Sequence, residues 1–143
     1  FDCYKFRSMM PNKDAHLYQA TRGDRRVNKL GKFIRKTSID ELPQFFNVLF
    51  GDMSVVGPRP HMVSHTNIYA KRIDKFMVRH FVKPGITGLA QISGYRGEIE
   101  SDEDIIGRVK YDIFYIENWS LLLDLKIIIR TFFNAVKGDE KAY

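Results

Sequence analysis

The chain has 143 residues, a single cysteine and a formal net charge of +6. Its length is enough for one domain with a core, and its hydrophobic and charged fractions of 44% and 28% exclude an intrinsically disordered chain. Because Cys3 has no second cysteine to pair with, a disulfide-stabilised scaffold is excluded and a reducing compartment is indicated.

Positive charge is concentrated at the start of the chain. Residues 1–36 hold ten Lys or Arg and three Asp or Glu, whereas residues 98–104 hold five acids and no base. This asymmetry predicts an anionic partner such as a phosphate, a nucleic acid or a lipid headgroup. The first residue is Phe1 rather than Met, so we expect the chain to belong to a longer protein.

The first elements are a strand and a loop. Residues 3–9, CYKFRSM, alternate in the way that a strand requires. Residues 10–30 read as a polar loop with a short helix near Ala15. No repeat, low-complexity tract or Gly/Ser linker interrupts residues 1–143, which predicts one domain.

A helix is predicted from Leu42 to a stop at Gly51. Its apolar residues recur at i, i+3, i+4 and i+7, the spacing that places them on one helix face. These residues are Leu42, Phe45, Phe46 and Leu49.

The stretch TSIDELPQ before this helix places two carboxylates, Asp40 and Glu41, ahead of a proline. Ser38 and Glu41 have the S-x-x-E spacing of a capping box, and Asp40 would then be a first-turn acid favoured by the helix dipole. Pro43 lacks the N–H that a regular helix needs at that position, so the turn should be irregular. Capping and chemistry both remain open for the pair.

A second helix is predicted to begin at Pro60. One face carries apolar and aromatic residues, and the basic residues lie largely outside it. The first group is Tyr69, Ile73, Phe76, Met77 and His80; the second is Lys71, Arg72, Lys75 and Arg79. The glycine-rich segment KPGITGLAQISGYRG then predicts a shaped loop with a short β-prone run at residues 89–93.

Two helices complete the chain. The third should run from Asp102 to Ile116, and the fourth should follow Asn118 or Ser120. The inward residues of the third should be Ile105, Val109, Ile113 and Ile116. The fourth, SLLLDLKIIIRTFFNAV, is apolar on more than one face but too charged to span a bilayer. It is either a buried core helix or a helix that lies at a membrane surface or against another segment.

Four blocks of this sequence resemble the bacterial sugar transferases, which are monotopic polyprenol-phosphate phosphoglycosyl transferases. They are CYKFRSM, LGKFIRKTSIDELPQFFNVLFGDMSVVGPRP, KPGITGLAQISGYRG and YDIFYIENWSLLLDLKIIIRT. The blocks follow the family's order over nearly the whole chain, and the second is the most specific. The chain departs from the family pattern in lacking the N-terminal hydrophobic helix that enters the membrane.

The resemblance implies transfer of a sugar 1-phosphate from a UDP-sugar to undecaprenyl phosphate with release of UMP, a Mg²⁺-dependent step that initiates a surface glycan. It implies an α+β fold, mostly helical with a small β element, at the cytoplasmic face of the bacterial inner membrane. Asp40 corresponds to the nucleophile that forms a covalent phosphosugar, and Glu41 to its partner. Either carboxylate could ligate Mg²⁺, and the division of their roles stays open.

The resemblance also implies roles for basic residues. Arg35 and Arg59 correspond to arginines that hold substrate phosphates, and arginine suits both places because its planar fork pairs with phosphate oxygens. Lys83 and Thr87 of the KPGITG loop are weaker candidates for substrate binding. Asp112 and Glu117 of YDIFYIEN either support the site or are acids on a helix surface, and the second is the commoner explanation.

Two alternative functions remain. A basic nucleic-acid-binding domain would fit the charge, but no recognition-helix, zinc-finger or RNP signature accompanies it, so we expect no nucleic-acid partner. A catalytically silent membrane-associated scaffold of the same fold would not need the intact Asp40 and Glu41 pair. We further expect the basic second helix and the basic N-terminal third to face anionic lipid.

Overall fold

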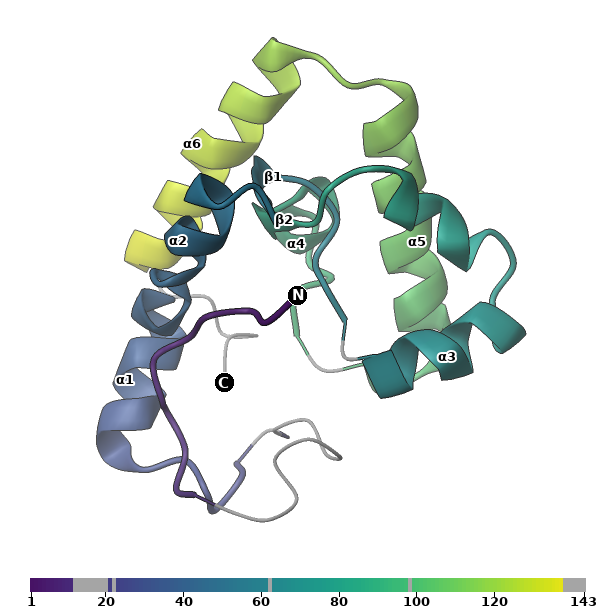
Figure 1. The fold of residues 1–143 in the computed structure, drawn as a ribbon. Helices are drawn as coiled ribbons and strands as arrows, with labels where there is room; N and C mark the ends of the chain where they lie inside the picture. Colours follow the sequence, from purple (N-terminus) through teal and green to yellow (C-terminus); the bar gives the residue numbers. More distant parts are fainter. Residues whose placement is uncertain (12–20, 22, 62, 98, 138–143) are drawn as a thin grey trace.

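The computed structural model describes residues 1–11, 21, 23–61, 63–97 and 99–137. Helices dominate and surround one small parallel sheet, so the predicted α+β architecture is confirmed (Figure 1). With η for a 3-10 helix, the elements are α1 (Lys29–Lys36), η1 (Ile39–Glu41), α2 (Gln44–Leu49), β1 (Ser54–Val56), α3 (Val63–Arg72), η2 (Phe76–Phe81), β2 (Gly85–Thr87), α4 (Leu89–Ile92), α5 (Asp102–Glu117) and α6 (Leu121–Lys137).

The sheet lies between two groups of helices. In Figure 1, α1, α2 and α6 lie on one side of it, and α3 and α5 lie on the other. The short helix α4 packs against both α5 and α6, and α6 also contacts both strands. In the described ranges, no helix combines the length and the hydropathy that crossing a bilayer requires.

The two strands are parallel, with Val56 opposite Thr87, and the segment between them, including α3 and η2, forms the crossover. Gly85 of β2 and Gly57, directly after β1, allow a close approach of the two backbones: a Cβ on Gly85 would lie 2.1 Å from the backbone nitrogen of Gly57. Gly85 N–H in turn donates to the carbonyl of Pro58 at 2.9 Å. The loop that carries Arg59 is therefore fixed to the second strand.

Helix α5 follows its sequence pattern closely. Ser101 caps its N-terminus in a capping box with Asp104, and Ile105 and Val109 are buried. They pack against Ile73 and against Phe76 of η2. The predicted third helix and its inward face are confirmed.

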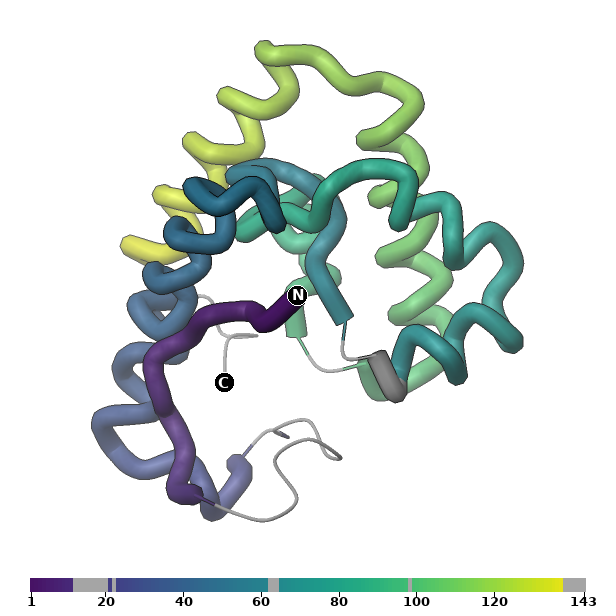
Figure 2. The backbone as a smooth tube through the Cα atoms, viewed as in Figure 1, coloured from purple at the N-terminus to yellow at the C-terminus, as the bar shows by residue number. Residues whose placement is uncertain are grey.

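Two predicted elements differ from the structure, and a third cannot be compared with it. The segment of residues 3–9 is not a strand; it runs extended beside α1 (Figure 2), and Tyr4 and Phe6 donate their N–H groups to Asn47 Oδ1 and Asp40 O, each at 2.9 Å, rather than to a strand. The run at residues 89–93 forms α4 instead of a strand. Leu, Ala and Gln favour helix once Gly88 has ended β2. The helix expected near Ala15 lies outside the described residues.

The predicted second helix is interrupted. Helix α3 begins at Val63 rather than Pro60 and ends at Arg72, and Lys75 adopts a left-handed conformation (φ 57°) before η2. The interruption rotates η2 so that Arg79, expected outside the apolar face, is buried, while Met77 is exposed. Lys71 and Arg72 remain exposed, as expected.

Helix α2 buries its polar face. Gly51 follows it with φ 85°, so the predicted stop is confirmed. However, Gln44 and Asn47 are 2% and 0% exposed, whereas the apolar face identified from the sequence points outward, with Leu49 78% exposed. The whole outward set is Leu42, Phe45, Phe46 and Leu49, to which Phe50 adds.

Helix α6 is not a buried core helix. Ile127 is its only fully buried residue, and most of its other large apolar side chains are exposed. These are Leu121, Leu122, Leu125, Ile128, Ile129, Phe132, Phe133 and Val136. The alternative, a helix that presents an apolar surface to another medium or segment, is the one that agrees with the structure.

Candidate active site

Asp40 and Glu41 lie on η1, in the irregular turn between α1 and α2. Ser38 adopts a left-handed conformation (φ 60°) and makes no side-chain cap, so the predicted capping box is wrong. Pro43 stands immediately before α2, and the irregularity that it predicted is confirmed. Instead of capping a helix, both carboxylic side chains are buried in the protein.

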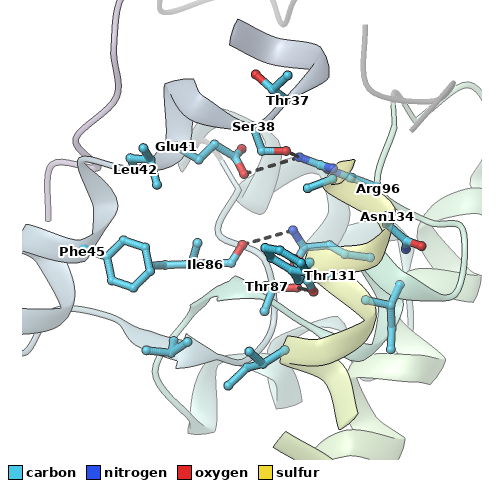
Figure 3. Close-up of a pocket in the computed structure, with 16 residues that line it drawn as sticks. Thr37, Ser38, Glu41, Leu42, Phe45, Ile86, Thr87, Arg96, Thr131 and Asn134 are labelled. Atoms are coloured by element: carbon cyan, nitrogen blue, oxygen red, sulfur yellow. Dashed lines mark hydrogen bonds and ion pairs between the residues drawn. The ribbon is translucent and has the colours of Figure 1, made fainter. Parts of the chain in front are cut away.

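Cations from three distant segments surround Glu41, and Figure 3 shows one of them, Arg96. Its Oε1 accepts a hydrogen bond from Arg59 at 2.6 Å and one from Lys5 at 3.3 Å. Its Oε2 lies 3.8 Å from the guanidinium of Arg96, which also donates to Ser38 Oγ at 2.5 Å. Glu41 thus joins the N-terminal segment, the loop after β1 and the loop after α4.

Asp40 is held through its backbone, because its carbonyl accepts from Phe6 N–H at 2.9 Å. Within the described part of the chain its carboxylate has no hydrogen bond or ion pair. The charges of Lys5, Arg35 and Arg59 nevertheless act on it. It is the acid of the pair whose oxygens are not committed to a protein partner.

The two carboxyl groups differ in acidity. Burial and then the charge of Glu41 raise the pKa of Asp40 above its ordinary value, against the opposing charges of Lys5, Arg35 and Arg59. Burial also acts to raise the pKa of Glu41, but the charges of Arg59 and Lys5 and the hydrogen bond from Arg59 outweigh it, so this pKa lies below its ordinary value. Such a separation is typical of carboxylates with different chemical roles.

A buried ion pair holds the loop of Arg59. Arg79 donates to the backbone carbonyl of Arg59 at 2.7 Å and pairs with Asp112 at 2.8 Å. Of the two alternatives for these acids, Asp112 is therefore a buried residue that supports the Arg59 loop, whereas Glu117 is an exposed acid on the helix surface. Burial raises the pKa of Asp112 to about 6, against the charges of Arg79 and Arg108.

The remaining predicted site residues are spread around the pair. Arg35, in the last turn of α1, lies close enough to lower the pKa of Asp40. Thr87, at the end of β2, is buried and lines the same cavity as Glu41. Lys83 is exposed, and its Nζ lies near Gly51, at the far end of α2. The structure brings Arg35, Arg59 and Thr87 toward the carboxylates but leaves Lys83 apart.

Two cations at the site, Lys5 and Arg96, were not among the predicted site residues. Both belong to blocks that resemble the family, CYKFRSM and KPGITGLAQISGYRG. Both contact Glu41, and their distance from it in the sequence conceals this contact, because the N-terminal segment and the loop after α4 must meet at η1. The only indication in the sequence was that each of these family-like blocks contains a basic residue.

The described residues contain no cluster of three or more His, Cys, Asp or Glu that could hold a metal on its own. Two adjacent carboxylates are nevertheless a suitable donor set for Mg²⁺, which commonly binds through one or two carboxylates and completes its shell with substrate phosphates and water. Asp40, whose carboxylate has no hydrogen-bond or ion-pair partner among the described residues, is the better placed of the two.

The site as a whole favours an anionic ligand. Lys5, Arg35, Arg59 and Arg96 carry four positive charges, and the two carboxylates carry two negative ones, which leaves a net charge of +2. An uncommitted carboxylate beside these cations can attack an electrophilic phosphorus, because the cations offset the repulsion between two anions.

Comparison with known proteins gives the family. The bacterial sugar transferase family matches residues 1–138. The chain is 60% identical to a UDP-glucose:undecaprenyl-phosphate glucose-1-phosphate transferase of Klebsiella pneumoniae, over 91% of this chain and 28% of the relative. It is 46% identical to a UDP-N-acetylgalactosamine-undecaprenyl-phosphate N-acetylgalactosaminephosphotransferase of Aeromonas hydrophila, over 96% and 32%.

An undecaprenyl-phosphate galactose phosphotransferase of Salmonella typhimurium is 41% identical, over 92% of this chain and 29% of the relative. The chain thus spans about a third or less of these relatives. The match over residues 1–138 covers both carboxylates and all four cations of the site. The chain belongs to the bacterial sugar transferase family.

Proposed function

We propose that this chain is the catalytic part of an enzyme that transfers a sugar 1-phosphate from a UDP-sugar to undecaprenyl phosphate. The observation that carries the proposal is the buried pair at η1, in which Glu41 is held by cations and Asp40 is not. The names of the relatives support the donor and acceptor classes. Their sugars differ, and the 60% identity supports UDP-glucose as the first donor to test.

In this mechanism Asp40 is the nucleophile. One of its oxygens attacks the phosphorus that bears the sugar, the bond from that phosphorus to the oxygen bridging to UMP breaks, and UMP leaves with the electron pair. A phosphate oxygen of undecaprenyl phosphate then attacks the same phosphorus and displaces the Asp40 carboxylate. The products are UMP and undecaprenyl diphospho-sugar, and Asp40 is regenerated.

The other residues act on charge and position. Glu41 orients Arg59, Lys5 and Arg96, and these cations together with Arg35 bind the diphosphate and offset its charge as Asp40 approaches. Mg²⁺, held by Asp40 or Glu41 and the donor phosphates, would supply further charge neutralisation at the diphosphate. Two of the basic residues that suggested a nucleic-acid partner, Lys5 and Arg35, thus face the carboxylates, and no observation favours that alternative.

A membrane surface is the partner that the exposed apolar side chains support. Helices α1, α2 and α6 lie on one side of the sheet in Figure 1, and we define their exposed apolar side chains as the outer apolar face. These are Leu30, Phe33, Phe45, Phe46 and Leu49, together with the eight exposed side chains of α6 named above. Exposed apolar surfaces of this extent mark interaction sites, and the acceptor is a membrane lipid. The proposed location is the cytoplasmic face of the bacterial inner membrane.

The proposed reaction is tested by UMP release from the full-length enzyme with undecaprenyl phosphate, Mg²⁺ and a panel of UDP-sugars. Asp40→Asn should reduce turnover by at least about a thousandfold, because an amide does not replace the carboxylate as a nucleophile. Asp74→Asn, at an exposed acid far along the chain, should retain turnover. Retention of turnover by Asp40→Asn would contradict the assignment of the nucleophile.

The covalent step is tested without acceptor. Wild-type enzyme quenched after exposure to a UDP-sugar should gain the mass of a sugar phosphate on the peptide that contains Asp40, and Asp40→Asn should not. Omission of Mg²⁺ should slow the gain. A gain on a different residue would move the nucleophile elsewhere.

The membrane surface is tested by co-sedimentation of the full-length protein, in detergent-free dilution, with vesicles of anionic lipid. Leu49→Glu, on the outer apolar face, should weaken binding. Charge reversal at Lys71 and Arg72 of α3 and at Lys75, just before η2, tests whether the end of α3 also faces lipid. Unchanged binding in the triple variant would exclude α3 from the membrane contact.

A further inference from the structure

A cavity of about 300 Å³ extends from the candidate active site into the protein. Its two walls are the η1 and α2 region, through Leu42 and Phe45, and helix α6, through Ile128 and Phe132. Its floor is formed by the sheet and α4, and Ile86 and Thr87 are labelled there in Figure 3. The volume is at the lower end of the range of small-ligand pockets.

The two ends of the cavity differ in chemistry. At one end lie Glu41, Ser38 and Arg96, which interact with one another. The side walls are mostly apolar, and the exposed wall residues Phe45 and Phe132 also belong to the outer apolar face. The cavity therefore connects a charged site to an apolar surface.

We infer that this cavity holds the isoprenoid carbons next to the phosphate of the polyprenyl acceptor, an inference that rests on the proposed function. A prenyl phosphate joins an anionic head directly to an apolar chain, which matches the charged end and the apolar walls. A nucleoside would need several hydrogen-bond partners. Two hydroxyls of the cavity, those of Thr87 and Thr131, are bonded to each other at 2.6 Å.

Two neighbouring phenylalanines on α6 offer a matched test. Phe132 and Phe133 are 67% and 64% exposed, but only Phe132 lines the cavity. In detergent-solubilised full-length enzyme, Phe132→Ala should raise the Kd for farnesyl phosphate, measured by calorimetry, by about five- to tenfold. Phe133→Ala should leave this Kd within about twofold.

Turnover gives a second readout. The KM for the prenyl phosphate should rise in Phe132→Ala while the KM for the UDP-sugar stays within about twofold. Ala135→Phe, which fills the cavity, should weaken acceptor binding further, and Val136→Phe, one residue along the same helix and outside the cavity, should not.

Each contrary result has a distinct meaning. A rise in the donor KM with an unchanged Kd for farnesyl phosphate would assign the cavity to the nucleotide and overturn the inference. Equal effects of Phe132→Ala and Phe133→Ala on this Kd would show that farnesyl phosphate contacts the outer apolar face rather than the cavity. This result would overturn the inference as well. If farnesyl phosphate binds as expected but no UDP-sugar releases UMP, the proposed function fails while the lipid-binding cavity stands.

Discussion

Helices α5 and α2 are both amphipathic, yet they bury opposite faces. Helix α5 places Ile105 and Val109 in a core with Phe76 and leaves most of its charged side chains outside. Helix α2 buries Gln44 and Asn47 and turns Phe46 and Leu49 outward. The spacing of apolar residues therefore identifies the apolar face of a helix, but it does not show whether this face packs in the core or points outward. The contacts with the rest of the chain determine that.

The polar face of α2 is turned inward because it forms hydrogen bonds with the N-terminal segment. Asn47 accepts from Tyr4 N–H at 2.9 Å and donates to the carbonyl of Asp2 at 2.8 Å. These bonds hold the N-terminal segment, from which Lys5 reaches Glu41. The buried polar face of α2 supports the candidate site, and its apolar face is left for the membrane proposed above.

The largest expected difference between the two regions is in the free energy of unfolding when a phenylalanine is replaced by alanine. Phe76→Ala empties a position that is 1% exposed in the core beside α5, and should lower the free energy of unfolding by about 3–5 kcal/mol. Phe46→Ala, at a position 58% exposed on α2, should change it by less than about 1 kcal/mol. Urea unfolding measures both, and a large loss for Phe46→Ala would show that the outer apolar face is covered within the chain.

The next comparison is between a buried and an exposed ion pair of equal length. Arg79–Asp112 and Arg72–Asp102 both measure 2.8 Å, but their side chains are 2% and 2% exposed in the first pair and 56% and 54% exposed in the second. Arg79→Met leaves Asp112 buried without its partner and should cost about 3 kcal/mol of stability. Arg72→Met should cost less than about 1 kcal/mol because water screens the exposed pair.

The same pair of variants separates stability from function. Arg79 also bonds the carbonyl of Arg59, so Arg79→Met should lower kcat/KM for UMP release even where the enzyme remains folded. Arg72→Met should not. Equal stability losses in the two variants would mean that burial does not distinguish the pairs.

Elements with local signals could be predicted from the sequence. The regular α5, the stop at Gly51 and the irregular turn at Pro43 depend on nearby residues, and the structure confirms each. The expected strand at residues 3–9 failed because alternation does not reveal whether a partner strand exists, and the partners here are a side chain and a 3-10 turn.

The candidate site shows the same limit. The carboxylates and two arginines could be proposed because they lie within one continuous block. Lys5 and Arg96 come from segments far from this block, and only the tertiary structure brings them to Glu41. The capping-box spacing of Ser38 and Glu41 was misleading because the ion pairs of Glu41 replace the local hydrogen bond that a cap would make.

A smaller effect tests the reversed burial of α2 directly. If α2 needed an apolar residue inward, Asn47→Leu would stabilise the protein. We expect instead a loss of about 1–3 kcal/mol, because Tyr4 N–H and the carbonyl of Asp2 lose their partner. Hydrogen exchange should show faster exchange of the Tyr4 amide in the variant, and increased stability with unchanged exchange would contradict the role of Asn47.

The smallest expected effect concerns acidity beside the α5 core. Burial, followed by the charges of Arg79 and Arg108, lowers the pKa of His61 to about 2. His61 packs edge-on against Tyr69 and Phe76 at 5.9 Å between ring centroids. Because the unfolded chain binds a proton near pH 6.5 and the folded chain does not, the stability that His61 contributes is present above this pH and is lost as the pH falls toward the folded pKa.

Between pH 7 and pH 6 this difference amounts to about 0.5–1 kcal/mol. His61→Phe removes the titrating group and keeps an aromatic ring, so the variant should lose less stability than the wild type over the same interval. The comparison of the two pH profiles cancels the opposite contribution of Asp112, whose raised pKa makes stability fall as the pH rises from about 4 to about 6. Parallel profiles would show that His61 is as accessible to protons in the folded protein as in the unfolded chain, and that the region beside α5 is more open than its packing indicates.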